Sequence, residues 1–409
     1  MRSVVALVSL VSAVVGAVVV LAVAAAFGWI GHDGSGSGTR TVVVTPPAPA
    51  ATAAPAAVRS SPKPLPATFD ARRIFATRSA GVVTIFSYFG SGPSADAAQG
   101  SGFVVASDGT ILTDAHVITN AGETSPGQTV KPASAVYIEF SDHDRIPAKV
   151  IGWDVFDDVG VIKVDPSQHP LAVVPLGESG SVAVGEPVAA IGSPLGNENS
   201  LAVGVVSAVH RSIPSITSRY QLIDALQTDA PITHGNSGGP LLDAAGRVIG
   251  INAQIRSQSG SGNDAGVGFA VPIDAAKRSL RELVHGGAVH YAYVGLTSEN
   301  LTPSLAQHLR IPVASGALVD AVTPGGPADQ AGIHGGTGES VFQGRSIVHG
   351  GDVIIAIDGL KVASADDLVR IVTNELDPQK VATFTIVRNG RRQTLPVRLG
   401  ERPANPHVP

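Results

Sequence analysis

The first long apolar segment of the chain covers residues 4–30, where no side chain is charged. Its length suffices to span a hydrocarbon layer of about 30 Å. Arg2 precedes it and the next basic residue is Arg40, so the positive-inside rule places the N-terminus in the cytoplasm and the remainder outside. The alternative is a cleaved signal peptide, with small residues at 24–26 for the peptidase. The run exceeds a signal core of about 7–15 residues, which favours an uncleaved membrane anchor.

Residues 33–66 have no apolar periodicity and are rich in Gly, Ser, Pro, Ala and Thr. This composition cannot bury a core and predicts a disordered tether with a reach of roughly 30 Å. The pattern therefore divides the chain into five parts. They are a cytoplasmic N-terminus with a transmembrane helix (1–32), a linker (33–66), a first globular domain (67–287), a second (288–400) and a tail (401–409).

The first globular domain carries many short apolar runs separated by turns, with a tight hairpin signal at residues 107–110. Helical periodicity is clear only at 273–285, where two glycines end the helix. Strands followed by one terminal helix predict a mainly β domain with two β-barrels rather than a parallel α/β sheet. The strand candidates are 81–85, 102–106, 135–140, 149–152, 159–164, 187–191, 201–209 and 248–253.

The second globular domain mixes strands with a single capped helix. A strand is predicted at 316–319, and Asn389-Gly390 indicates a hairpin. Ser364, with Asp367 three residues later, predicts the start of a helix at Ala365. Residues 334–349 form a Gly-rich insertion of unassigned role.

The composition limits the number of domains and excludes several kinds of site and partner. The chain has 409 residues, 44% of them hydrophobic, a net charge of −5 and no cysteine. This length and hydrophobic content allow two or three domains that each bury a hydrophobic core. The chain has no basic run, which argues against a nucleic-acid partner. Because it has no cysteine, a cysteine nucleophile, disulfides and thiolate metal sites are excluded.

Ser237 is the candidate nucleophile, because glycines surround it in the sequence Gly235-Asn236-Ser237-Gly238-Gly239. The same letters fit the G-x-S-x-G elbow of α/β-hydrolases, which passes from a strand into a helix. Here Pro240 and two short apolar runs predict a β-hairpin instead. This disfavours a small-ester hydrolase and places the base and the acid upstream, in the His, Asp, Ser order of chymotrypsin-like proteases.

His116 is the candidate base, since it follows the predicted hairpin at the end of an apolar strand. The acid must be buried beside the imidazole, and Asp158 fits because it begins the apolar run 159–164. Asp154 and Asp157 are rivals that we interpret as solvated loop charges. The backbone N–H groups of Gly235 and Ser237 would form the oxyanion hole.

These motifs together resemble the HtrA (Deg) family of serine proteases. The resemblance rests on residues 100–103, 113–117, 154–163, 191–196, 228–241 and 268–272, in one order. It implies that Ser237 is the nucleophile, His116 the base and Asp158 the acid that orients it, with no metal or organic cofactor. It also implies a homotrimer or larger oligomer and a protease controlled by loops that order the oxyanion hole. Residues 211–221 include a candidate sensor loop.

The second globular domain resembles a PDZ domain of the bacterial protease type. Its motifs lie at 293–296, 316–319, 325–333 and 350–359. The resemblance implies that Tyr293, Val294, Gly295 and Leu296 form the loop that captures a peptide C-terminus, while the peptide adds as a strand.

Three positions depart from the family pattern. His234 replaces a usual proline, Asp114 a common asparagine and Gly160 a common alanine. None of these changes removes a proposed catalytic group.

The substrate pocket of such folds is lined by residues some six positions before the serine and by the strand after it. Here these are Pro231, Ile232, Ile251, Asn252 and Ala253. No acid is present to pair with Lys or Arg, so we expect small or medium apolar side chains before the scissile bond. Such side chains are buried in native proteins, which favours unfolded substrates.

The sequence thus predicts a membrane-tethered, extracytoplasmic serine endopeptidase for misfolded or specific envelope proteins, with a role in protein quality control and stress response. The PDZ domain would recruit or sense peptide C-termini. The rival hypothesis is a non-proteolytic peptide-binding scaffold or holdase. A complete set of Ser237, His116 and Asp158 argues against it, because a scaffold needs none of the three.

Overall fold

The computed structural model describes residues 69–90, 96–122, 129–193, 200–233, 235–253 and 267–403. The predicted membrane segment, the linker, His234 and residues 194–196 lie outside these ranges. Within the described ranges, no helix combines the length and apolar character needed to cross a membrane. All described residues belong to one compact unit, residues 62–409.

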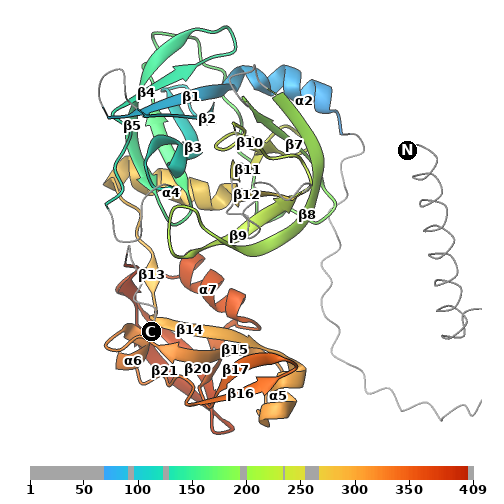
Figure 1. Ribbon diagram of the computed structural model, residues 1–409, viewed down its shortest axis with the longest axis vertical. Coiled ribbons are helices and arrows are strands. Elements are labelled where there is room, and N and C mark those ends of the chain that lie inside the picture. The colour runs from blue at the N-terminus through green and yellow to red at the C-terminus, as the bar shows by residue number, and fades with distance from the viewer. Residues whose placement is uncertain are drawn as a thin grey trace, which may run out of the picture. The chain divides into compact units, whose positions relative to one another are not determined.

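The first β-barrel closes in the order β1-β2-β3-β6-β5-β4, and Figure 1 labels its strands β1 to β5. Apolar side chains from alternate strand positions fill it, among them Ile85, Ile111 and Ile162. Its strands are β1 (Val82–Phe89), β2 (Asp96–Val104), β3 (Thr110–Asp114), β4 (Ala135–Glu139), β5 (Arg145–Asp154) and β6 (Val159–Lys163).

The second β-barrel closes in the order β10-β11-β12-β9-β8-β7. A further apolar cluster joins side chains of both barrels, including Phe103, Leu112, Ile191 and Ile251. The two closed barrels confirm the predicted double-barrel fold. The strands are β7 (Pro187–Gly192), β8 (Ser200–Pro214), β9 (Gln221–Thr228), β10 (Pro240–Leu242), β11 (Val248–Ala253) and β12 (Gly268–Pro272).

The terminal helix α4 (Ile273–Gly286) follows β12 as predicted, and ends at Gly287 in the left-handed conformation, φ 74°. Sequence reasoning missed helix α2 (Ala71–Arg78), because its alanines and arginines form no clear apolar stripe. Asp70 caps α2 through an N–H bond from Arg73 of 2.9 Å. A short helix, α3 (Ala115–Ile118), begins directly after β3, so His116 lies in a helical turn rather than on the strand end.

The C-terminal part is built on a sheet of order β14-β15-β18-β20-β21, with β14 at one edge and β19 paired to β18. Ser364 caps α7 by accepting from the N–H of Asp367, as predicted, and Asn389-Gly390 joins β20 to β21. The insertion 334–349 contains a hairpin of β16 and β17 that the sequence did not predict. The elements are β13 (Ala292–Tyr293), β14 (Leu296–Leu301), α5 (Pro303–Leu309), β15 (Gly316–Val322), α6 (Pro327–Gln330), β16 (Gly338–Phe342), β17 (Arg345–His349), β18 (Val353–Ile357), β19 (Leu360–Lys361), α7 (Ala365–Asn374), β20 (Val381–Arg388), β21 (Arg391–Arg398) and β22 (Gly400–Glu401).

Candidate active site

His116 and Asp158 are held together by their backbones as well as by their side chains. His116 Nδ1 lies 2.8 Å from Asp158 Oδ2, and the His116 N–H donates to Asp158 Oδ1 at 3.0 Å. The N–H of Ala115 donates to the carbonyl of Asp158 at 3.1 Å. Asp158 adopts a left-handed backbone conformation, φ 54°, which is uncommon for a residue with a side chain. These bonds therefore attach the first turn of α3 to Asp158, the residue that precedes β6.

Ser237 lies in the turn that leads into β10. Its carbonyl accepts from the N–H of Ser101 at 2.8 Å, and the next N–H, of Gly238, donates to Asn252 at 2.9 Å. A Cβ on Gly238 would lie 3.1 Å from the backbone nitrogen of Asp114, two residues before His116. The serine turn thus packs directly against the segment that carries His116. Ser237 is 4% exposed, and its hydroxyl makes no hydrogen bond with the described residues.

The two proposed oxyanion donors occupy a tight turn. Gly235 has φ 100°, and its carbonyl accepts from Ser101 Oγ at 2.5 Å. Asn236 closes the turn by donating to the carbonyl of Thr233 at 3.0 Å. These bonds fix the peptide planes around Ser237.

The sequence predicted that Asp154 and Asp157 are solvated loop charges, and this prediction is wrong. They are only 2% and 4% exposed. Asp154 Oδ2 accepts from Ser279 Oγ at 2.7 Å and from the Tyr291 hydroxyl. Asp157 Oδ2 accepts from Arg278 at 2.6 Å and lies 2.9 Å from the Tyr291 hydroxyl, whose single proton it shares with Asp154. Burial, together with the charge of Asp157, raises the pKa of Asp154 to about 6.

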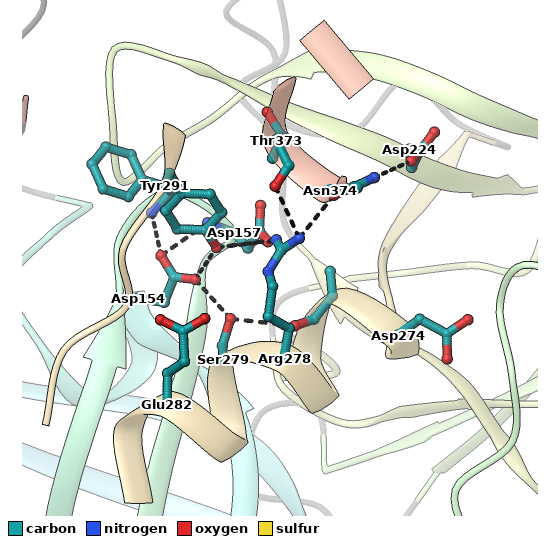
Figure 2. A network of polar contacts seen from close by, with 12 residues as sticks. Asp154, Asp157, Asp224, Asp274, Arg278, Ser279, Glu282, Tyr291, Thr373 and Asn374 are labelled. Atoms are coloured by element: carbon teal, nitrogen blue, oxygen red, sulfur yellow. Dashed lines mark hydrogen bonds and ion pairs between the residues drawn. The ribbon is translucent and has the colours of Figure 1, made fainter. Parts of the chain in front are cut away.

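Figure 2 shows how this network reaches beyond the first barrel. Arg278 on α4 donates to the carbonyl of Thr373 at 3.2 Å and to Asn374 Oδ1 at 2.9 Å, both at the end of α7. Asn374 in turn donates to Asp224 Oδ2 on β9 at 2.8 Å. Sequence reasoning found neither Arg278 nor Tyr291, because nothing in their local sequence indicates such distant partners.

The environment of His116 favours its protonated form. Burial opposes the charge, but the charge and hydrogen bond of Asp158 and the charge of Asp114 outweigh it, and the pKa of His116 rises to about 9. Asp114 Oδ2 lies 3.8 Å from His116 Nδ1. Burial and the charge of Asp158 raise the pKa of Asp114 well above its usual value.

Asp114, His116 and Asp158 form the single group among the described residues with three potential metal-ligand side chains. The ring nitrogen of His116 and the carboxylate of Asp158 already bond one another. We therefore assign no metal to this group.

The residues predicted to line the substrate pocket differ in burial. Ile251 is fully buried and belongs to the apolar cluster between the barrels. Asn252 is also fully buried and donates to the carbonyl of Pro240 at 3.2 Å, while Ala253 is 6% exposed. Ile232 is half-buried and Pro231 is exposed. Their role as a pocket stays a prediction.

The loop 293–296 is anchored by its carbonyl groups. The carbonyl of Val294 accepts from Ala328 at 2.9 Å, and that of Gly295 accepts from Thr323 at 2.9 Å. Gly295 has φ 77°. The loop opens into β14, the edge strand of its sheet, and α7 packs beside that strand.

Gly238 offers a test of how closely the serine turn packs. A Cβ there would lie 2.2 Å from the Ser101 carbonyl oxygen and 2.3 Å from Thr113 Oγ1. Gly185 is the control, because its φ of 90° is similar but it has no atom within 4 Å. We expect Gly185→Ala to cost roughly 1–2 kcal/mol of unfolding free energy and Gly238→Ala roughly 1–3 kcal/mol more, measured by urea unfolding. Equal midpoints for the two variants would contradict the packing described.

Residues 100–251 match the trypsin-like peptidase domain family, and residues 292–399 match the PDZ domain family. Over 313 residues the chain is 36% identical to the putative serine protease HhoA of Synechocystis sp., covering 75% of this chain and 71% of the relative. It is 35% identical over 314 residues to a probable periplasmic serine endoprotease DegP-like of Hahella chejuensis, covering 77% of this chain but 59% of that relative.

A solved structure described as the HtrA-type protease AlgW with tripeptide is similar over 82% of this chain and 98% of that chain. The TM-score is 0.65 and the sequence identity 28%. The chain therefore belongs to the HtrA/DegP family of serine proteases, with a trypsin-like peptidase domain followed by one PDZ domain.

Proposed function

We propose that this chain is an extracytoplasmic serine endopeptidase in which Ser237 is the nucleophile, His116 the general base and Asp158 the residue that orients it. The observation that carries the proposal is the buried pair of His116 Nδ1 and Asp158 Oδ2 at 2.8 Å. The serine turn packs against the segment carrying that pair. Family membership supports the same assignment.

In the proposed reaction, Ser237 Oγ attacks the scissile carbonyl and passes its proton to His116 Nε2. Asp158 holds the opposite ring nitrogen and stabilises the imidazolium that forms. The N–H groups of Gly235 and Ser237 stabilise the oxyanion, where one donor accounts for about 10²–10³-fold in rate. The imidazolium then protonates the leaving amine, and water hydrolyses the acyl-enzyme with His116 again as base. The hydrogen bond between Ser237 and His116 forms in the complex with substrate.

We propose unfolded proteins outside the cytoplasm as substrates. Several relatives are described as probable periplasmic serine endoproteases, which supports that location. The predicted apolar pocket favours side chains that native proteins bury. Residues 4–30 would tether the enzyme to the cell membrane, and the family resemblance suggests a homotrimer or larger homo-oligomer.

The PDZ domain would bind peptide C-termini along the edge of β14, with the carboxylate at loop 293–296. It would influence catalysis through α7, because Arg278 bonds both the end of α7 and Asp157. Asp157 immediately precedes Asp158. The loop after β8 meets the same region, since Thr217 Oγ1 donates to the carbonyl of Val155 at 2.7 Å. That contact supports a sensor role for part of residues 211–221, although 211–214 belong to β8.

Digestion of casein tests the proposed activity. We expect the wild type to cleave unfolded casein and Ser237→Ala to leave it intact, because the nucleophile is gone. Fragments are followed by gel electrophoresis and mass spectrometry. If both proteins left casein intact with and without peptides that end in apolar residues, while both bound those peptides, the peptide-binding scaffold would be the better description.

Asn374→Ala tests the proposed route from the PDZ domain. The change removes the side-chain bonds to Arg278 and Asp224 but leaves the buried pair of Arg278 and Asp157 intact. We expect the stimulation of casein cleavage by an apolar C-terminal peptide to change about two- to tenfold, the worth of one or two such bonds.

Glu375→Ala is the matched control, because it is the next residue and is also exposed. We expect its stimulation factor to equal that of the wild type. A normal stimulation factor in Asn374→Ala, with peptide affinity unchanged, would show that the signal takes another path.

A further inference from the structure

Asp114 is a buried acid that the reaction proposed above does not use. It is the last residue of β3 and is 0% exposed. Its Oδ2 lies 3.8 Å from His116 Nδ1, the ring nitrogen that also bonds Asp158. Neither carboxyl oxygen accepts a well-formed hydrogen bond from the described residues, because the N–H of Gly238, which faces the carboxyl, donates to the carbonyl of Asn252 at 2.9 Å. A carboxyl group placed in this way interacts with the imidazole mainly through its charge.

The groups that face Asp114 come from three segments. Asp158 approaches from the turn before β6 and His116 from α3, and the N–H of Gly238 approaches from the serine turn. Burial and the charge of Asp158 raise the pKa of Asp114, and the opposing effects of His116 and Gly238 do not offset them. No lysine or arginine contributes to the charge balance at this carboxyl within the described ranges.

The proton on the pair of Asp114 and His116 can therefore be placed in two ways. In one, Asp114 is a neutral acid and His116 a neutral imidazole. In the other, the proton has moved to the ring, so that Asp114 is ionised and His116 is an imidazolium. Both arrangements carry the same total charge, and Asp114 and His116 titrate as a coupled pair. Only the first can accept a proton from Ser237.

We propose that Asp114 is a positioning residue that acts through His116, as a second acid whose proton competes with that of the catalytic imidazole. This inference rests on the proposed function. With Asp114 present, His116 would stay protonated up to a higher pH. Proteolysis would therefore require more alkaline conditions. The carboxyl does not touch the substrate and forms no bond to it.

Asp114→Asn is the discriminating variant, because asparagine fills the same volume but cannot ionise. An opposite charge within about 4–6 Å shifts a pKa by roughly 1–3 units. We expect the variant to become active at lower pH, with the acidic limb moved down by about 1 pH unit and the rate near pH 7 raised up to about tenfold.

The measurement is the rate at which a fluorophosphonate labels Ser237, between pH 5 and pH 10, in the wild type and in Asp114→Asn. The rate reports the fraction of His116 present as free base without involving PDZ ligands or substrate binding. Asp142→Asn is the control, because this exposed acid pairs with His169 away from the site; its profile should match the wild type. Superimposed profiles for Asp114→Asn and wild type would overturn the inference and leave Asp114 a packing residue.

The experiment distinguishes failure of this inference from failure of the proposed function. If the wild type were not labelled at Ser237, the proposed function would fail, whereas labelling with an unshifted limb contradicts only the role of Asp114. If Asp114→Asn did not fold, judged by circular dichroism, NMR titration of the His116 ring in the wild type would decide. Two coupled inflections support the inference, and a single inflection contradicts it.

Discussion

The constraint on which this active-site region depends is the burial of three carboxyl groups within five residues. Asp154 is the last residue of β5, Asp157 and Asp158 lie in the turn that joins β5 to β6, and each of the three is almost fully buried. An unpaired buried carboxylate costs several kcal/mol, so each requires its own partners. Asp158 has the ring and the backbone of His116. Asp157 has Arg278, and Asp154 has Ser279 with Tyr291.

These requirements bring separate parts of the chain to one place. Arg278 and Ser279 come from α4, which follows the second barrel, and Tyr291 comes from the segment that leads into β13. Tyr291 lies two residues before Tyr293, where the proposed peptide-binding loop begins. The side chains that bond Asp154 and Asp157 therefore lie on the stretch of chain that leads directly into the PDZ domain. A peptide bound at that loop has a short covalent and hydrogen-bonded route to the proposed catalytic acid.

The sequence predicted the features that depend on local patterns. Alternating apolar runs and turn residues identified the barrels, and Ser364 with Asp367 identified the start of α7. It failed where a residue's environment is set by distant segments. Asp154 and Asp157 have the local sequence of an exposed turn, but α4 and Tyr291 cover them. Helix α2 was missed because no apolar stripe indicates it, and the β16–β17 hairpin because glycines obscure its strands.

Asp114 illustrates the same limit within the candidate site. The sequence showed only an aspartate where asparagine is common. Its burial, and the distance of 3.8 Å to the ring of His116, follow from how β3 meets β6 and the serine turn. A buried acid next to a catalytic base changes the proton balance of the base, whereas an exposed acid in the same sequence would not.

The central claim is that Ser237 is activated by His116 under the control of Asp158. The most direct measurement is mass spectrometric mapping of the fluorophosphonate adduct in the wild type and in Asp158→Asn, with labelling rates compared at one pH. The account predicts a single adduct on Ser237 and a loss of about 10⁴-fold in labelling rate for Asp158→Asn, since the amide leaves the wrong tautomer of the imidazole. An adduct on another residue, or an unchanged rate in Asp158→Asn, would contradict it.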